Sequence, residues 1–179
     1  SMALVGVRVD PYQISHPMPR ERIANLETLA RGSRHFDRAD PPALQQRHDM
    51  VRAKIAAFTQ GHAAAGRLFR GNPGGVAAIY ADSIGTFLSG NARAAVSKID
   101  TLVRAAPKNP YFHEMRGEIL MKAGRPAEAA SSFATAMRLD PHRSGIIQIG
   151  HGQALMATGK QEDLRKAVNE LQAGLSRDR

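Results

Sequence analysis

The stretch GEILMKAGRPAEAASSFATAMRLDP, residues 117–141, decides the fold of this chain. It follows an apolar segment that begins near Tyr111, and Gly124 interrupts it where a helix end favours a left-handed residue. Pro126 then stands where a first helical residue needs no N–H, and Pro141 cannot continue a helix. The spacing therefore predicts two helices, over about 111–122 and 126–139, joined by a tight turn.

Each predicted helix carries one apolar stripe. The spacing of three and four residues is the period of an amphipathic helix that buries one face. The first stripe consists of Phe112, Met115, Ile119 and Leu120, and the second of Ala129, Phe133, Ala136 and Met137. Gly117 and Ala129 are small, which predicts a close approach of the two helices where they cross. The sequence therefore predicts an antiparallel helical hairpin.

The same pattern recurs with a period of 34 residues. Gly90 precedes Gly124 by 34 residues, and Gly159 follows Gly124 by 35. Fixed periods of this size are typical of stacked helical repeats. We expect repeats at 76–109, 110–143 and 144–179, a degenerate hairpin at 42–75 that breaks at Gly61, and an extension over 1–41 with a short helix. The predicted class is all-α.

The third repeat departs from the period. One residue is inserted, so the motif positions of Gly117, Leu120 and Gly124 recur 35 residues later, at Gly152, Leu155 and Gly159. The next small residue, Ala167, comes three residues later than that offset requires. Residues 161–164 are therefore expected to lengthen the turn of the third repeat. The chain also ends at the second helix of this repeat, and no capping helix follows it.

The pattern resembles the tetratricopeptide repeat family. The positions that match the family motif in the second repeat are Gly117, Leu120, Gly124, Ala129, Phe133, Ala136 and Pro141. The resemblance implies a right-handed α-solenoid of antiparallel hairpins that binds other proteins. It also implies a concave groove lined by the first helix of each hairpin. By phase, the groove residues would be Tyr80, Ile84, Phe87, Tyr111, Glu114, Glu118, Lys122, Gln148 and Gln153.

Residues 15–23 read SHPMPRERI, which resembles the closing signature of the M48 zinc metallopeptidase domain. A short amphipathic helix with Ile23, Leu26 and Leu29 overlaps its end. The resemblance implies a parent protease with a tetratricopeptide domain after the peptidase domain. It further implies a periplasmic location and clients among outer-membrane proteins or their assembly machinery, and places His16 near the metal cleft of the parent.

The residues that M48 catalysis needs are absent from this chain. A catalytic helix carries His-Glu-x-x-His, in which two histidines one turn apart bind Zn²⁺ and the glutamate activates water. His113-Glu114 is the one His-Glu pair, and Gly117 occupies the place of the second histidine. We therefore expect no catalysis, no metal site and no cofactor in this fragment, with zinc confined to the parent peptidase domain.

The formal net charge is +9, and cysteine is absent. The excess of positive charge is largest over 41–75, where Asp49 is the one acidic residue. The five cations of this segment are Arg47, Arg52, Lys54, Arg67 and Arg70. Such a basic face is either solvated or faces an acidic partner or an anionic membrane surface. Few aromatic residues lie there to stack on bases, which argues against nucleic acid.

Three functions remain open from sequence. The first is an interaction module that binds client polypeptides for an M48-type protease in envelope protein quality control. The second is a free-standing adaptor with no protease attached, and the third is a basic solenoid that binds nucleic acid. In the first two cases the partners are proteins or peptides, and no small-molecule substrate is expected.

Overall fold

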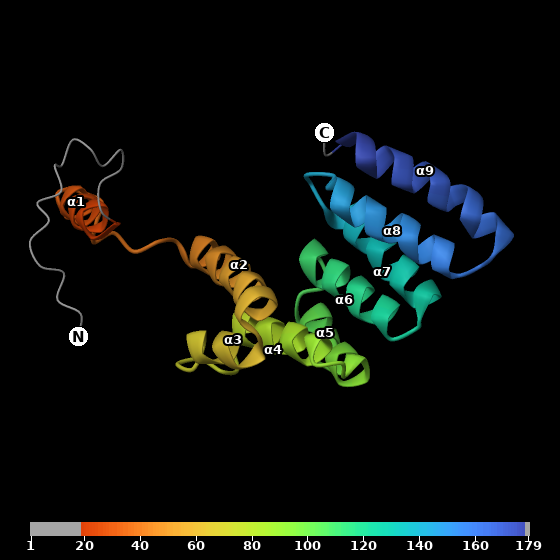
Figure 1. Cartoon of the computed structure of the whole chain (residues 1–179), viewed down its shortest axis with the longest axis horizontal. Coiled ribbons are helices and arrows are strands. Elements are labelled where there is room, and N and C mark those ends of the chain that lie inside the picture. Colours follow the sequence, from red (N-terminus) through yellow and green to blue (C-terminus); the bar gives the residue numbers. More distant parts are fainter. Residues whose placement is uncertain (1–18, 178–179) are drawn as a thin grey trace, which may run out of the picture. The chain divides into compact units, whose positions relative to one another are not determined.

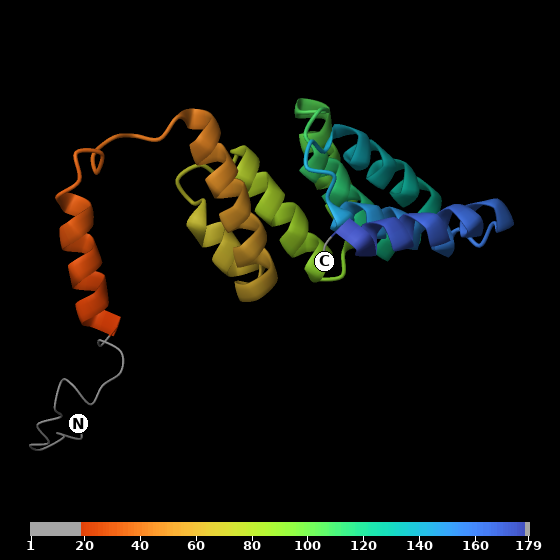
Figure 2. The ribbon, with the colours of Figure 1, turned by 90° about the horizontal axis from the view of Figure 1, so that it is seen from above.

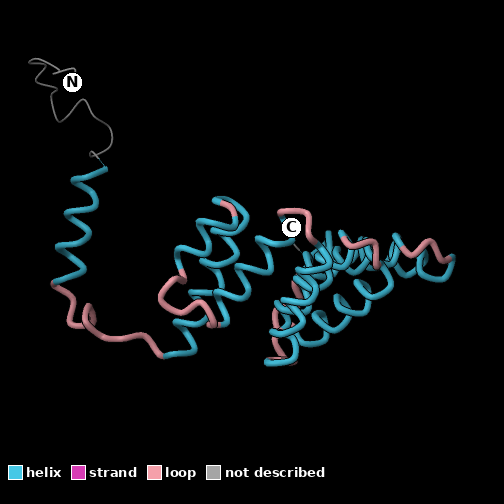
Figure 3. Tube along the Cα trace, turned by 90° about the horizontal axis from the view of Figure 1, so that it is seen from below, coloured by secondary structure: helices cyan, strands magenta, loops and turns pink. Residues whose placement is uncertain are grey.

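The computed structural model describes residues 19–177, and these form helices joined by short loops (Figure 1). No strand occurs in this range, as Figure 3 shows by the absence of strand colour. The prediction of an all-α fold is therefore confirmed for the described part of the chain. The chain divides between Pro41 and Pro42 into two compact units, which are described separately.

The first unit contains helix α1 (Pro19–Arg31). Ile23, Leu26 and Leu29 lie on one side of it, as predicted, and each leaves more than half of its surface exposed. Arg31 binds Glu27 one turn earlier, with 2.7 Å between Nη2 and Oε1. The predicted metal-cleft neighbour, His16, lies outside the described residues, as do the other residues of 15–18, while 19–23 form the start of α1.

The second unit is a series of four helical hairpins (Figure 2). The second helix of each hairpin packs on the first helix of the next. In each hairpin, the helix that comes earlier in the chain is called the first helix below, and the one that follows it is called the second helix. The pairs are α2 (Pro42–Gln60) with α3 (His62–Leu68), α4 (Val76–Leu88) with α5 (Ala92–Ala105), α6 (Pro110–Lys122) with α7 (Pro126–Leu139), and α8 (Gly145–Ala157) with α9 (Gln161–Arg177).

A left-handed glycine closes each hairpin turn. The φ angles of Gly61, Gly90, Gly124 and Gly159 lie between 71° and 88°, a region that side chains with a Cβ rarely occupy. The predicted lengthening of the third turn is wrong. Helix α9 begins two residues after Gly159, just as α7 begins two residues after Gly124. Residues 161–164 are the first turn of α9, so the irregularity lies in the phase of this helix and not in its turn.

The hydrophobic core follows both predicted stripes. Phe112, Met115, Ile119 and Leu120 are at most 1% exposed, and Phe133 of α7 is 3% exposed. The contact at Gly117 is with Phe133 of α7. A Cβ on Gly117 would lie 2.7 Å from one edge of the Phe133 ring, and a Cβ on Gly150 would lie 2.7 Å from the other. The ring is therefore held between α6 and α8, and two glycines make the space for it.

Side-chain caps fix two of the helix starts. The amide oxygen of Asn91 accepts a hydrogen bond from the backbone N–H of Ala94, and that of Asn109 accepts one from Tyr111. Such caps satisfy N–H groups that have no partner within the helix. None of the helices within residues 19–177 combines the length and the apolar character needed to cross a membrane.

Candidate partner-binding surface

Five of the predicted groove residues reach the surface of the first helices. Tyr111 and Lys122 on α6 and Gln153 on α8 are exposed, while Phe87 on α4 and Glu118 on α6 are half-buried. Tyr111 leaves about half of its surface open, 49%. A tyrosine offers a rigid contact area at a low entropic cost, which favours binding of a polypeptide. These positions remain candidates for partner contacts.

The prediction that the other four groove residues point outward is wrong. Tyr80 and Ile84 of α4 are 2% and 0% exposed, because the neighbouring hairpins cover them. The Tyr80 ring lies 5.7 Å from that of Phe112, centroid to centroid. Glu114 is 7% exposed and is bound by Lys54 of α2.

The prediction is also wrong for Gln148, which contacts the second helix of its own hairpin instead of a neighbouring hairpin. Its Nε2 donates to Glu170 over 2.6 Å, and its Oε1 accepts from Arg177 over 2.6 Å. Both partners belong to α9. The side chain therefore holds the last hairpin together and is buried between its helices.

Sequence reasoning missed three exposed apolar side chains on the first helices α4 and α8: Leu88, Ile146 and Met156. The repeat period could have found them. Ile146 follows Tyr111 by 35 residues, the offset of the third repeat, and Leu88 precedes Lys122 by 34. Together with Tyr111 they make the apolar part of what we call the first-helix surface. The exposed members of this surface are Leu88, Tyr111, Lys122, Ile146, Gln153 and Met156.

A cluster of charged side chains also lies among the first helices. Lys54 Nζ lies 3.1 Å from Glu114 Oε1, which joins α2 to α6 across 60 residues of sequence. Glu118, one turn further along α6, has no ion pair with any cation in residues 19–177. Burial raises the pKa of Glu118; the charge of Lys54 lowers it in part, and the neighbouring Glu114 raises it again. The pKa therefore lies above the usual glutamate range.

The charges of the same two glutamates act on the hydroxyl of Tyr80. Burial raises the pKa of this hydroxyl well above its ordinary value, and the charges of Glu114 and Glu118 raise it further. It therefore stays protonated. It makes no hydrogen bond with any other group in the described part of the chain, and its oxygen is not among the buried polar atoms without a partner, so water reaches it.

Replacing Glu118 with glutamine is expected to stabilise the folded protein near neutral pH. A carboxyl whose pKa is raised on folding binds its proton more tightly in the folded state, so its penalty appears as pH rises through the unfolded value. The penalty is complete above the folded pKa. Thermal unfolding of Glu118→Gln should therefore give a higher Tm than the wild type at about pH 7, and the difference should vanish near pH 3. An equal or lower Tm at pH 7 would contradict this reading of Glu118.

Within residues 19–177, some cations of the predicted basic face form ion pairs and the others do not. Arg47, Arg67 and Arg70 are exposed and form no ion pair within residues 19–177. Arg52 binds Asp49 over 3.2 Å, and its guanidinium lies 5.9 Å from the centre of the Phe69 ring. The prediction is wrong for Lys54, whose ammonium is committed to Glu114.

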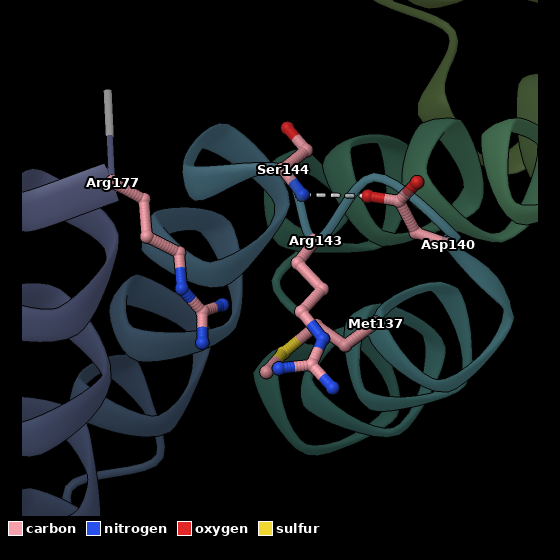
Figure 4. A pocket seen from close by; sticks show the side chains of 5 residues that line it. All are labelled: Met137, Asp140, Arg143, Ser144 and Arg177. Atoms are coloured by element: carbon pink, nitrogen blue, oxygen red, sulfur yellow. Dashed lines mark hydrogen bonds between the residues drawn. The ribbon is translucent and has the colours of Figure 1, made fainter. Parts of the chain in front are cut away.

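Two cavities lie elsewhere in the second unit. The smaller one, about 180 Å³, lies at the start of α8 and is lined by Met137, Asp140, Arg143, Ser144 and Arg177 (Figure 4). The carboxylate of Asp140 accepts hydrogen bonds there from the backbone N–H groups of Ser144 and His142. The larger one, about 370 Å³, lies among α5, α6 and α7, where Arg116 binds both Asp100 and Ser132. In both, a polar side chain serves to link neighbouring helices.

Stacked hairpins of this kind, closed by left-handed glycines, define a tetratricopeptide-like solenoid. The solved structure named MamA MSR-1 C2 is similar to this chain in fold, with a TM-score of 0.54 and 19% sequence identity over 73% of this chain and 72% of that one. At that identity the likeness shows the fold and nothing finer. No family model matches the sequence, and no curated protein matches it.

Proposed function

We propose that this chain is a protein–protein interaction module that binds an extended polypeptide on its first-helix surface. The observation that supports the proposal is the set of apolar side chains that α4, α6 and α8 leave exposed: Leu88, Tyr111, Ile146 and Met156. Tetratricopeptide-like folds typically bind proteins and are typically non-catalytic. Within residues 19–177, no three His, Asp or Glu side chains are grouped as metal ligands.

The proposal extends to the protein that the module serves. The similarity of residues 15–23 to the M48 signature supports a periplasmic zinc metalloprotease as the parent, with clients from envelope protein quality control. Zinc would then belong to the parent peptidase domain. The exposed stripe of α1 and a second one on α2 (Leu44, Val51, Ile55 and Phe58) support this, because large apolar faces usually pack against another body. A free-standing adaptor is the alternative.

Photo-crosslinking tests the binding surface in cells. Tyr111 would be replaced by a photoreactive phenylalanine analogue, and Thr101, exposed on the second helix α5, would carry the same residue as a control. We expect defined adducts with other polypeptides from position 111 and none from position 101. Equal labelling at both positions, or none at position 111, would overturn the proposed function.

The size of the native protein tests its parentage. An antibody raised against this domain should detect, in fractionated cells, a periplasmic or membrane-associated protein well above 19.4 kDa. A shift of that band to a lower mass when codons upstream of this domain are deleted would support a parent with a further domain before it. A cytosolic band near the mass of this chain would instead establish the free-standing adaptor.

A further inference from the structure

We propose that the cavity among α5, α6 and α7 binds a phosphate group, either as the free ion or as a small phosphate monoester. Its volume is about 370 Å³, and polar side chains from all three helices line it. A water molecule takes about 30 Å³ in the liquid, so the cavity has room for a tetrahedral ion. None of the lining residues belongs to the first-helix surface, and the proposal is therefore independent of the proposed function.

The first argument is an excess of positive charge in the lining. Arg104 and Arg116 line the cavity, and Asp100 is the one carboxylate among its lining residues. Arg116 neutralises Asp100, with 2.6 Å between Nε and Oδ1. Arg104 forms no ion pair within residues 19–177, so the charge of its guanidinium is not compensated.

A third guanidinium reaches the cavity from α7. Nη2 of Arg138 donates to Oγ1 of Thr135, a lining residue, over 3.1 Å. Arg138 is exposed and forms no ion pair in the described part of the chain. Glu128, one turn before Ser132 on α7, is bound by Arg125 through two contacts of 2.6 Å. Two positive charges therefore remain, which matches a phosphate monoester, since its charge is close to −2 above about pH 7.

The second argument is the hydroxyl of Ser132, which lines the cavity on a residue that is 3% exposed. Its oxygen accepts a hydrogen bond from Nη1 of Arg116 over 2.7 Å. A hydroxyl can donate as well as accept, and the Ser132 hydroxyl donates to no group within residues 19–177. The hydroxyl of Ser131, also in the lining, donates to none there either. Both hydrogens are therefore available to the oxygen atoms of a ligand.

The guanidinium of Arg116 is already held in place for an oxyanion. Nε donates to Asp100 and Nη1 donates to Ser132, while Nη2 makes no hydrogen bond with any group in residues 19–177. Guanidinium groups match the geometry of phosphate oxygens, and their hydrogen bonds to an anion are stronger than neutral ones. A side chain that is fixed before binding also loses less conformational entropy on binding. These properties favour phosphate as the ligand.

A metal ion fits the cavity less well. The carboxylate of Asp100 is bound by Arg116, and the other charged groups of the lining are cationic at neutral pH. Nε2 of His113 donates to the backbone carbonyl of Pro107 over 2.8 Å, so this nitrogen is not free to coordinate a metal. No three His, Asp or Glu side chains are grouped as metal ligands within the described residues.

An NMR titration of the whole chain tests the site. Inorganic phosphate, methyl phosphate and dimethyl phosphate would be added at about pH 8 and constant ionic strength, while backbone amide shifts are followed. We expect saturable shifts around Arg104, Arg116 and Ser132, with a dissociation constant of about 1 mM or lower for the first two ligands. Binding of inorganic phosphate alone would identify the free ion as the ligand, and binding of methyl phosphate would identify a monoester. Dimethyl phosphate carries one charge and should bind at least about tenfold more weakly than the tighter of the two.

Two variants place the effect at the cavity. Arg104→Gln and Arg138→Gln change exposed side chains that form no ion pair within residues 19–177, so the fold should be retained. Each should weaken phosphate binding at least about tenfold, because each removes a charge-assisted contact. Arg93→Gln is the matched control: it removes the same charge from an exposed position on α5 that does not line the cavity. Its affinity for phosphate should equal that of the wild type.

The remaining outcomes would overturn the proposal. Absence of saturable shifts at the lining residues with both inorganic and methyl phosphate would show that the cavity takes no phosphate. Equal losses in Arg93→Gln and Arg104→Gln, or equal affinity for dimethyl phosphate, would show that the anion is attracted by the overall positive charge alone. The crosslinking experiment at Tyr111 decides the proposed function separately, because it reports contacts on the first-helix surface.

Discussion

Phe133→Ala is expected to lower the free energy of unfolding by about 3–5 kcal/mol, the usual cost of removing a buried aromatic ring. The ring is 3% exposed and lies against Gly117 of α6 on one edge and Gly150 of α8 on another. No neighbouring side chain stands between the ring and these backbones, so the cavity left behind cannot be filled without moving a helix. Urea denaturation followed by circular dichroism measures the loss.

Phe58→Ala is the matched control, because Phe58 lies within helix α2 but leaves 44% of its surface exposed. Its cost should stay below about 1 kcal/mol, since surface substitutions seldom cost more. Comparable losses for the two variants would contradict the central position given to Phe133. A selective loss would show that three successive helices depend on one side chain.

Gly117→Ala is expected to destabilise the wild-type protein by about 1–3 kcal/mol through overpacking. The added Cβ would lie 2.7 Å from the Phe133 ring, and Gly150 blocks the ring from moving the other way. In the Phe133→Ala background the ring is gone, so the same substitution should be neutral or stabilising. Alanine favours a helix over glycine by roughly 1 kcal/mol. The four unfolding free energies form a double-mutant cycle with a large coupling.

Gly66→Ala provides the comparison for an uncrowded helical glycine. It lies in α3, and a Cβ there would meet nothing within 4 Å. This substitution should stabilise the protein by up to about 1 kcal/mol, since glycine is entropically costly in a helix.

The double-mutant cycle can also contradict the contact between Gly117 and Phe133. Additive effects of Gly117→Ala and Phe133→Ala would show that the two residues do not touch in solution.

The hairpins could be predicted from sequence because local chemistry fixes them. A glycine with positive φ and a proline at the start of a helix act within a few residues, so Gly124 and Pro126 mark the turn correctly. Apolar stripes likewise identify the core of α6 and α7. The repeat of helical hairpins followed from the spacing of these signals, and the tetratricopeptide-like solenoid followed from the family resemblance that they carry.

The burial of the first-helix residues could not be predicted in this way. Tyr80 and Glu114 were expected to face outward, but both are buried and contact other hairpins: Tyr80 lies beside Phe112, and Glu114 binds Lys54. Lys54 and Glu114 are 60 residues apart in sequence, and no local pattern predicts that two such distant residues form an ion pair. The irregular spacing after Gly159 predicted a longer turn, but α9 begins two residues after this glycine, so the turn keeps its length.

The Lys54–Glu114 bond has a consequence for how this array opens. In an ideal solenoid each repeat touches only its neighbours, so stability is a sum of nearest-neighbour terms and either end can fray alone. Here the first hairpin also binds the third, over the intervening α4–α5 pair. Losing the first hairpin leaves a buried carboxylate without its cation in the third. The first and third hairpins are therefore coupled beyond nearest-neighbour packing, so loss of the first hairpin should also destabilise the third.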